Sequence, residues 1–269
     1  MADERIENII EEFKDYLNNI GRFYKDSLYI SSDSNDTTEK LIQDSHEKTE
    51  TLTEPDKVTK KAGVEVDLFG NITHVQEEWE FAESLEQLNS LICNCQKCAL
   101  GATRTKFVFG VGNPNADIVL IGEAPGADED AKGEPFVGRA GQLLNKILEA
   151  SGFKREEVFI CNILKSRPPG NRNPLPEEVD ACKPYLDKQL KLINPKLILL
   201  LGRVAAESLL KTREPLNKLR GKVHDYRGFK VMVTFHPAAL LRNPQWKRPT
   251  WEDMKQFKIL YHQIIEIQK

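Results

Sequence analysis

The sequence predicts an α/β protein: a three-layer α/β/α sandwich around a central, mainly parallel sheet of about four strands, preceded by an N-terminal helix and a disordered linker. Two observations lead to this fold class. Short apolar runs without polar alternation recur through the second half of the chain, and each is followed by a segment whose apolar residues have helical spacing. Strands that are buried on both faces and joined by crossover helices have this pattern.

The expected strands and helices alternate from residue 117 onwards. Strands are expected at 117–122, 157–163, 196–202 and 230–235, and the helices that follow them at 139–150, 176–193, 203–211 and 250–266. A further helix is expected at 77–92, where the apolar residues also have helical spacing. Because parallel strands end at one rim of a sheet, the loops after the first and last strands are expected to share the rim where open α/β folds bind ligands.

The first 75 residues differ in composition from the rest of the chain. Residues 1–30 are predicted to form an amphipathic helix, whose apolar stripe needs a partner: the main domain, another copy or another protein. Residues 31–75 are predicted to be an acidic, largely disordered linker, because the segment up to residue 61 has too little apolar surface to offset its chain entropy. Residues 64–75 within it are ambiguous. The folded domain is expected at 76–269.

Charge and cysteine content narrow the class of protein. Residues 1–90 carry 9 Lys and Arg against 22 Asp and Glu, whereas residues 91–269 carry 29 against 19. A basic folded half fits a polyanionic partner and fits a solvated basic surface equally well. No apolar run is long enough to span a bilayer, and the N-terminus does not resemble a secretory signal. The five grouped cysteines favour a metal over disulfides, so a cytoplasmic protein without a membrane partner is expected.

Two loops carry the polar residues of the predicted rim. Gly122-Glu-Ala-Pro-Gly126 follows the first strand and brings a carboxylate together with closely approaching backbone. His236-Pro-Ala-Ala-Leu-Leu-Arg242 follows the last strand and brings an imidazole and a guanidinium group. Together they predict a site for an anionic or polarised ligand.

Two further segments join these loops in a pattern that identifies a family. They are Gly133-Glu-Pro-Phe-Val-Gly-Arg-Ala-Gly-Gln-Leu-Leu144 and Arg167-Pro-Pro-Gly-Asn-Arg-Asn-Pro174. The four segments, taken in their order along the chain, closely resemble the family 4 uracil-DNA glycosylases, the iron–sulfur-containing branch of their superfamily. The resemblance covers about residues 91–265. It implies a hydrolase of base excision DNA repair that flips uracil out of DNA and hydrolyses its N-glycosidic bond, leaving an abasic site.

The resemblance assigns roles around the extruded base. Phe136 is expected to stack on the uracil ring, Asn162 to read its N3 and O4 edge, and His236 to donate to O2 as charge develops there. The alternatives are a core position for Phe136 and structural roles for Asn162 and His236.

Two acidic residues are harder to place. Glu123, next to Gly122, is expected to orient a water or the backbone contacts to uracil, and Glu129 to close the pocket near C5. A sister family has an acidic water activator where this chain has Ala124. The resemblance therefore implies a dissociative reaction without a strong general base.

Contacts to DNA are expected from two segments. Leu240 and Leu241 resemble an apolar wedge that fills the gap left by the flipped base, with Arg242 on a phosphate. The expected backbone contacts after the second strand are Lys165, Arg167 and Arg172. Surface decoration is the alternative for each basic residue.

A [4Fe-4S] cluster is implied with one ligand in doubt. Cys95 and Cys98 are two residues apart, as in cluster-binding pairs, and Cys182 follows far along the chain. The family has its fourth thiolate at the position of Ser166, so Cys161 and Cys93 are further candidates. A cluster with a substitute ligand, another metal such as zinc, and no metal all remain open.

Two other functions within the same superfamily are conceivable: a catalytically inactive member and one that traps itself covalently on uracil-containing DNA. Covalent trapping would use a His in the loop after the strand that bears Asn162, and residues 165–174 contain none. The presence of Glu123, Phe136, Asn162 and His236 together argues against an inactive scaffold.

Overall fold

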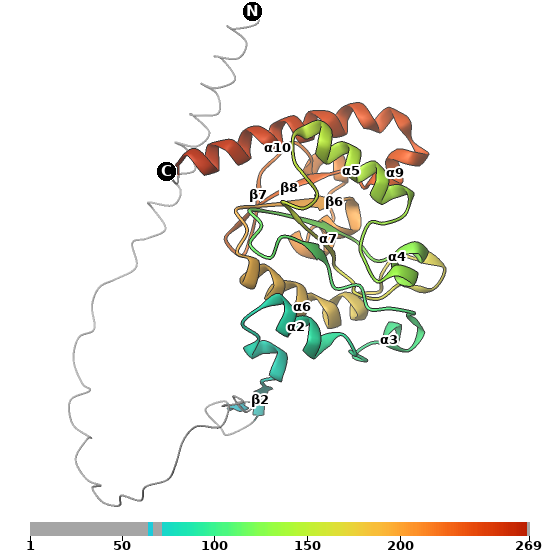
Figure 1. Cartoon of the computed structure of the whole chain (residues 1–269), viewed down its shortest axis with the longest axis vertical. Helices are drawn as coiled ribbons and strands as arrows, with labels where there is room; N and C mark the ends of the chain where they lie inside the picture. Colours follow the sequence, from blue (N-terminus) through green and yellow to red (C-terminus); the bar gives the residue numbers. More distant parts are fainter. Residues whose placement is uncertain (1–63, 67–71, 268–269) are drawn as a thin grey trace, which may run out of the picture. The chain divides into compact units, whose positions relative to one another are not determined.

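The computed structural model describes residues 64–66 and 72–267 (Figure 1). The predicted helix at 1–30 and residues 31–63 of the predicted linker lie outside the described residues, so the domain boundaries remain predictions. Within the ambiguous segment, β1 (Val64–Val66) and β2 (Ile72–Val75) pair as an antiparallel ribbon.

Six strands form the central sheet in the order β3-β5-β4-β6-β8-β7. The four inner strands are parallel: β5 (Phe159–Asn162), β4 (Ile118–Gly122), β6 (Leu197–Leu201) and β8 (Phe229–Thr234). These are the four predicted strands, and the predicted fold class is confirmed. Two short antiparallel edge strands were not predicted, namely β3 (Val111–Gly112) and β7 (His224–Tyr226).

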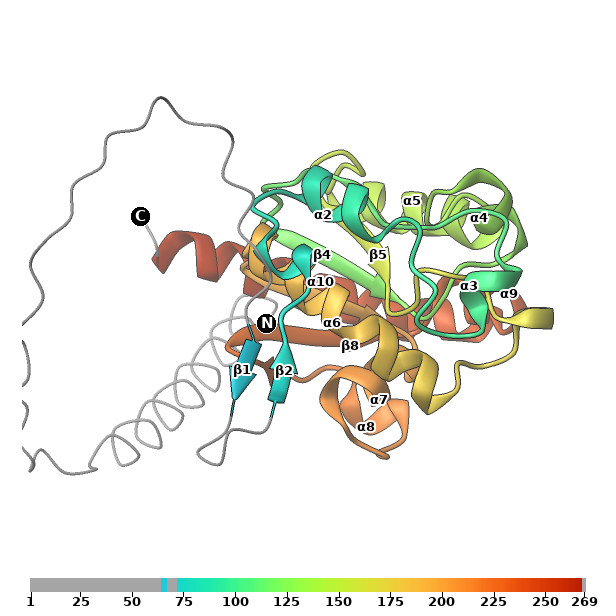
Figure 2. The same cartoon turned by 90° about the horizontal axis from the view of Figure 1, so that it is seen from below.

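Helices cover both faces of this sheet. Figure 1 shows α5 (Arg139–Ser151) and α10 (Lys247–Ile267) on one side and α6 (Pro176–Ile193) and α2 (Leu85–Ile92) on the other. Figure 2 shows α7 (Arg203–Leu210) and α8 (Leu216–Leu219) beside β8. None of the described helices is long and apolar enough to cross a bilayer.

The remaining helical segments are short and lie mostly in the loops. They are η1 (Glu78–Phe81), α3 (Leu100–Thr103), α4 (Ala127–Lys132), η2 (Pro169–Asn171), α9 (Pro237–Arg242) and η3 (Pro244–Trp246). The single helix predicted at 77–92 is divided into η1 and α2, because Ser84 caps α2 by accepting a hydrogen bond from Gln87 N at 3.1 Å.

Complete burial of the inner strands explains their unbroken apolar sequences. Every residue of β4 and β6 is buried. Val119 and Ile121 belong to the core shared with α2, α6 and α7. Since side chains alternate along a strand, Ile118 and Leu120 face the layer of α5 and α10. The polar residues that end these strands therefore meet at one rim of the sheet.

Candidate active site

A pocket of about 350 Å³ lies at the carboxyl ends of β4, β5 and β8. Its walls bring together most of the residues predicted from the loops. From the predicted set, the lining includes Glu123, Ala124, Glu129, Phe136, Asn162, Arg172, His236 and Arg242. A second cavity of about 410 Å³, near Asn113 and Tyr261 at the opposite ends of the strands, contains none of them. The rim that parallel topology predicts is therefore the one that carries the chemistry.

Asn162, the last residue of β5, points a bare amide into this pocket. It is 2% exposed, and neither its Oδ1 nor its Nδ2 has a hydrogen-bond partner among the described residues. Gly122 makes room for it, because a Cβ there would collide with Asn162 Oδ1 and lie 2.6 Å from Phe136 Cζ. A buried amide without partners costs about 1–3 kcal/mol. The pocket is therefore suited to a ligand that presents a donor beside an acceptor.

Phe136 forms the aromatic wall of the pocket. Its ring centroid lies 5.5 Å from that of His236, with an angle of 31° between the planes. Its backbone has a φ of 53°, which is uncommon for a residue with a large side chain. Gly141 permits this turn, because a Cβ there would collide with the Phe136 carbonyl. The loop glycines thus place the ring where a flat ligand can lie against it.

His236 caps α9 and is neutral near pH 7. Its Nδ1 accepts a hydrogen bond from Ala238 N at 3.1 Å, so the proton of the neutral ring lies on Nε2. Burial, reinforced by the charge of Arg242 and opposed by that of Glu129, lowers its pKa to about 4. The imidazole is therefore a hydrogen-bond donor through Nε2 without carrying a positive charge.

The two acidic residues of the pocket differ in their surroundings. Glu129 accepts hydrogen bonds from three backbone amides, those of Gly126 (3.1 Å), Val137 (2.9 Å) and Gly138 (3.0 Å). Its oxygens hold the loops together, and because Glu129 also lines the pocket, its contact near C5 stays a prediction. Burial raises the pKa of Glu123, and Arg203 partly offsets this. Glu123 is thus the carboxylate of the pocket that remains available to a ligand or water.

Two of the predicted DNA contacts are wrong. Lys165 is completely buried, and its Nζ donates to Asn162 O at 2.8 Å and to Gln189 Oε1 at 2.6 Å. A charged residue at this position suggests a solvent-exposed loop, yet Lys165 follows the apolar residues of β5 into the core. Leu240 is also buried, on the inner face of α9, whereas Leu241 is 45% exposed. Any apolar wedge on α9 is therefore Leu241 alone.

Of the other predicted basic residues, Arg172 and Arg242 line the pocket. Arg172 is held by Glu178, with Nη1–Oε2 and Nη2–Oε1 distances of 2.9 and 2.6 Å. This pairing occupies both terminal nitrogens, so Arg172 is less available to a phosphate than predicted. Arg167 Nε donates to Asn171 Oδ1 at 2.8 Å, on the exposed loop after β5.

The predicted cluster ligands lie on segments that the structure brings together. Tyr185, one turn after Cys182 on α6, donates its hydroxyl to Cys95 Sγ at 3.3 Å. Burial raises the pKa of Cys182, and the charges of Cys98 and Cys95 also raise it, as expected of close neighbours. Arg104 Nη1 then links Cys95 O (2.6 Å) to Ser166 Oγ (3.4 Å).

The donor set in this neighbourhood is three thiols and one hydroxyl. Of the alternative fourth ligands, Cys161 is buried within β5, and Cys93 Sγ donates to Ser90 O at 3.5 Å. Within the described part of the chain, no group of three or more His, Cys, Asp or Glu is arranged to hold a metal ion. Sulfur-rich donors of this kind suit an iron–sulfur cluster or zinc.

Comparison with known proteins places this geometry in a family. The Uracil DNA glycosylase superfamily matches residues 109–255, which include Glu123, Asn162 and His236. A type-4 uracil-DNA glycosylase of Archaeoglobus fulgidus is 46% identical over 64% of this chain and 91% of its own length. The type-4 enzyme of Thermotoga maritima is 43% identical over 65% of this chain and 94% of its own length. A type-5 enzyme of Thermus thermophilus is 34% identical over 38% of the chain and 53% of its own length. The chain therefore belongs to the uracil-DNA glycosylase superfamily, in its type-4 branch.

Proposed function

We propose that this protein is a uracil-DNA glycosylase that flips uracil out of DNA and hydrolyses its N-glycosidic bond, leaving an abasic site. The observation that carries the proposal is the unpartnered, buried amide of Asn162 in a pocket with one aromatic wall. This pocket fits a flat ligand that has a hydrogen-bond donor and an acceptor on one edge.

Uracil presents this edge. Its N3–H donates to Asn162 Oδ1 while its O4 accepts from Nδ2, so both orphaned atoms gain partners. With the amide in this orientation, cytosine would face Oδ1 with its N3 acceptor and Nδ2 with its amino donor, which are groups of the wrong kind. A site built to hydrogen-bond one edge rejects a mismatched one strongly, because its buried polar groups stay unpaired. Phe136 adds stacking on the ring, worth about 1–3 kcal/mol per base.

His236 supports departure of the base. As the glycosidic bond breaks, negative charge collects on the uracil ring, and the neutral Nε2–H donates to O2. The bond from Ala238 N to Nδ1 holds the ring in this tautomer before substrate arrives. A preorganised donor of this kind contributes on the order of 2.7–4 kcal/mol to transition-state stabilisation.

Glu123 serves the water that completes the reaction. Its carboxylate lines the pocket without a side-chain hydrogen bond or ion pair among the described residues. It orients the water that captures the sugar once the bond has broken, in a dissociative reaction that requires no strong base. Outside the pocket, Leu241 fills the space left by the base, and Arg242 and Arg167 meet the phosphates.

The protein's own residues also support a [4Fe-4S] cluster. Cys95, Cys98 and Cys182 would hold it, with Ser166 at the fourth ligand position. When bound, the cluster would supply a covalent cross-link between residues 95–98 and α6, and base release would not pass through it. The predicted protein partner of residues 1–30 and the cytoplasmic location stay predictions.

The test is base release from defined oligonucleotides. Wild-type protein is incubated with strands that carry one uracil, cytosine or thymine, and abasic sites are revealed by alkaline cleavage. We expect cleavage at uracil alone. His236→Ala should slow it by about 10²–10³-fold, while Lys222→Ala, an exposed residue distant in sequence from the pocket segments, should not. No cleavage at uracil by wild-type protein would overturn the proposal.

A further inference from the structure

A stack of flat groups lies directly behind His236. Phe235 is buried, and the Trp246 ring lies parallel to it, with 4.7 Å between centroids and an angle of 15°. The guanidinium carbon of Arg220 is 4.4 Å from the same Phe235 centroid. Trp246 and Arg220 therefore both pack against the Phe235 ring.

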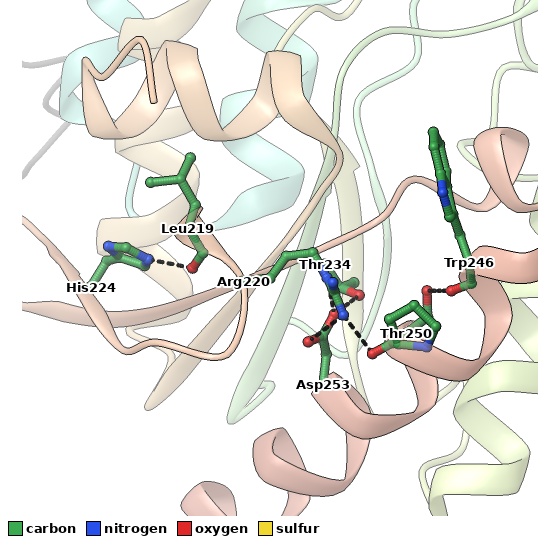
Figure 3. Close-up of polar contacts among 8 residues, drawn as sticks. Leu219, Arg220, His224, Thr234, Trp246, Thr250 and Asp253 are labelled. Carbon is green, nitrogen blue, oxygen red and sulfur yellow. Dashed lines mark hydrogen bonds and ion pairs between the residues drawn. The ribbon is translucent and has the colours of Figure 1, made fainter. Parts of the chain in front are cut away.

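A buried ion pair fixes the arginine of this stack. Arg220 Nε and Nη2 donate to the two oxygens of Asp253 on α10, at 2.7 and 2.9 Å, and Nη2 also donates to Pro249 O at 2.6 Å (Figure 3). Thr234, the last residue of β8, donates to the same carboxylate at 2.6 Å. Both side chains of the ion pair are nearly inaccessible, at 14% and 5% exposure.

The stack joins the two ends of one segment. Phe235 precedes His236 and α9, while Trp246 ends η3, which follows α9. Trp246 is anchored in turn, because its carbonyl accepts from Thr250 Oγ1 at 2.8 Å (Figure 3). Residues 235–246 therefore form a closed loop whose outer face carries Leu241 and Arg242. Buried ion pairs are weak stabilisers compared with apolar replacements, so a geometric role accounts better for this one.

We propose that Arg220 is a positioning residue, which through Phe235 and Trp246 clamps the loop of residues 235–246 and so places His236 against the substrate. The proposal rests on the proposed function, since His236 is the donor to the leaving base. A displacement of about 1 Å at a reacting group costs on the order of 10²-fold in rate. The clamp therefore keeps His236 from moving by this distance.

The test compares variants of the stack with a matched aromatic contact elsewhere on α10. Arg220→Met removes the ion pair but keeps a long apolar stem, and Trp246→Leu removes the stack while Trp246→Phe keeps it. Phe153→Leu is the control, because Phe153 packs edge-on against Phe257 and Tyr261 of α10 at 6.0 and 5.7 Å. Melting temperature, single-turnover uracil release at saturating enzyme, and the ¹⁵N NMR spectrum of His236 are measured for each.

Arg220→Met and Trp246→Leu should lower the single-turnover rate by about 10- to 100-fold, and Trp246→Phe should retain it. The NMR signals of His236 should move from a single Nε2–H tautomer towards a mixture. Phe153→Leu should lower the melting temperature without changing the single-turnover rate or the NMR signals of His236. Rates and His236 spectra in the stack variants that match those of Phe153→Leu would overturn the proposal. An inactive wild-type protein would instead refute the glycosylase function, and the spectra would still decide whether the clamp exists.

Discussion

Protonation of His236 offers a sharp test of how the site works. If the neutral imidazole is the donor, activity survives acidification until the folded-state pKa is reached, which is about 4 rather than the usual 6.5. The acid limb of kcat/KM, which reports the free enzyme, should then fall near pH 4. A charged imidazole as the active form would produce the opposite trend, with activity rising as the pH falls through its pKa.

The same shift has a consequence for stability. Above pH 6.5 the ring is neutral in both the folded and the unfolded state, so the shift has no effect there. Between pH 6.5 and 4 the unfolded chain binds a proton that the folded chain does not, and stability is lost as the pH falls. Lowering the pKa from 6.5 to about 4 corresponds to a total loss of roughly 3 kcal/mol. His236→Gln should remove this loss.

The assay needs two controls because the pocket contains a second titrating group. Burial raises the pKa of Glu123, so its protonation also contributes to the acid limb. The pH profile is therefore measured in wild type and in Glu123→Gln, where the contribution of Glu123 is removed. His224→Gln is the control for replacing a histidine outside the pocket, where His224 Nε2 hydrogen-bonds Leu219 O (Figure 3). An acid limb near 6.5 in Glu123→Gln, absent from His236→Gln, would refute the neutral-donor argument.

Three other predictions follow from particular contacts. Lys165→Met leaves Asn162 O and Gln189 Oε1 unpaired, so the free energy of unfolding in urea should fall by about 1–3 kcal/mol. The salt dependence of DNA binding should stay as in wild type. A shallower dependence of log Kd on log salt concentration would instead mean that Lys165 contacts DNA. Ser166→Cys completes a four-thiolate set, so anaerobically purified protein should hold more iron per chain and keep its visible absorbance longer in air; equal iron content and equal decay would contradict a ligand position there. Deletion of residues 1–75 removes an excess of acidic residues, so the Kd for DNA should fall at low salt; weaker binding by the truncated protein would contradict it.

The sequence predicts the inner strands of the sheet better than its edge strands. Unbroken apolar runs identify β4, β5, β6 and β8, because strands buried on both faces leave no room for polar alternation. Edge strand β3 has two residues, Val111 and Gly112, and is defined by its pairing with β5 rather than by any local pattern. Such pairings depend on tertiary contacts, which a single sequence does not display.

The residues of the candidate site also divide into those that the sequence predicts and those that it does not. Glu123, Phe136, Asn162 and His236 follow from motifs at strand ends, and the structure brings them to one pocket. Lys165 was misplaced because a charged residue after a strand normally lies in solvent. Here Gln189 on α6, distant in sequence, supplies the partner that permits its burial. The clamp behind His236 was missed for a similar reason, since its members come from four separate segments.

The central claim is that the amide of Asn162 reads the edge of uracil, and Asn162→Asp tests it most directly. A protonated aspartic acid presents a hydroxyl donor and a carbonyl acceptor that can be arranged to match cytosine as well as uracil. The measurement is the ratio of cytosine to uracil release under single turnover, in wild type and in the variant. We expect a ratio indistinguishable from zero in wild type and a measurable one in Asn162→Asp. Undiminished preference for uracil in the variant would contradict the role of Asn162 and with it the proposed mechanism of recognition.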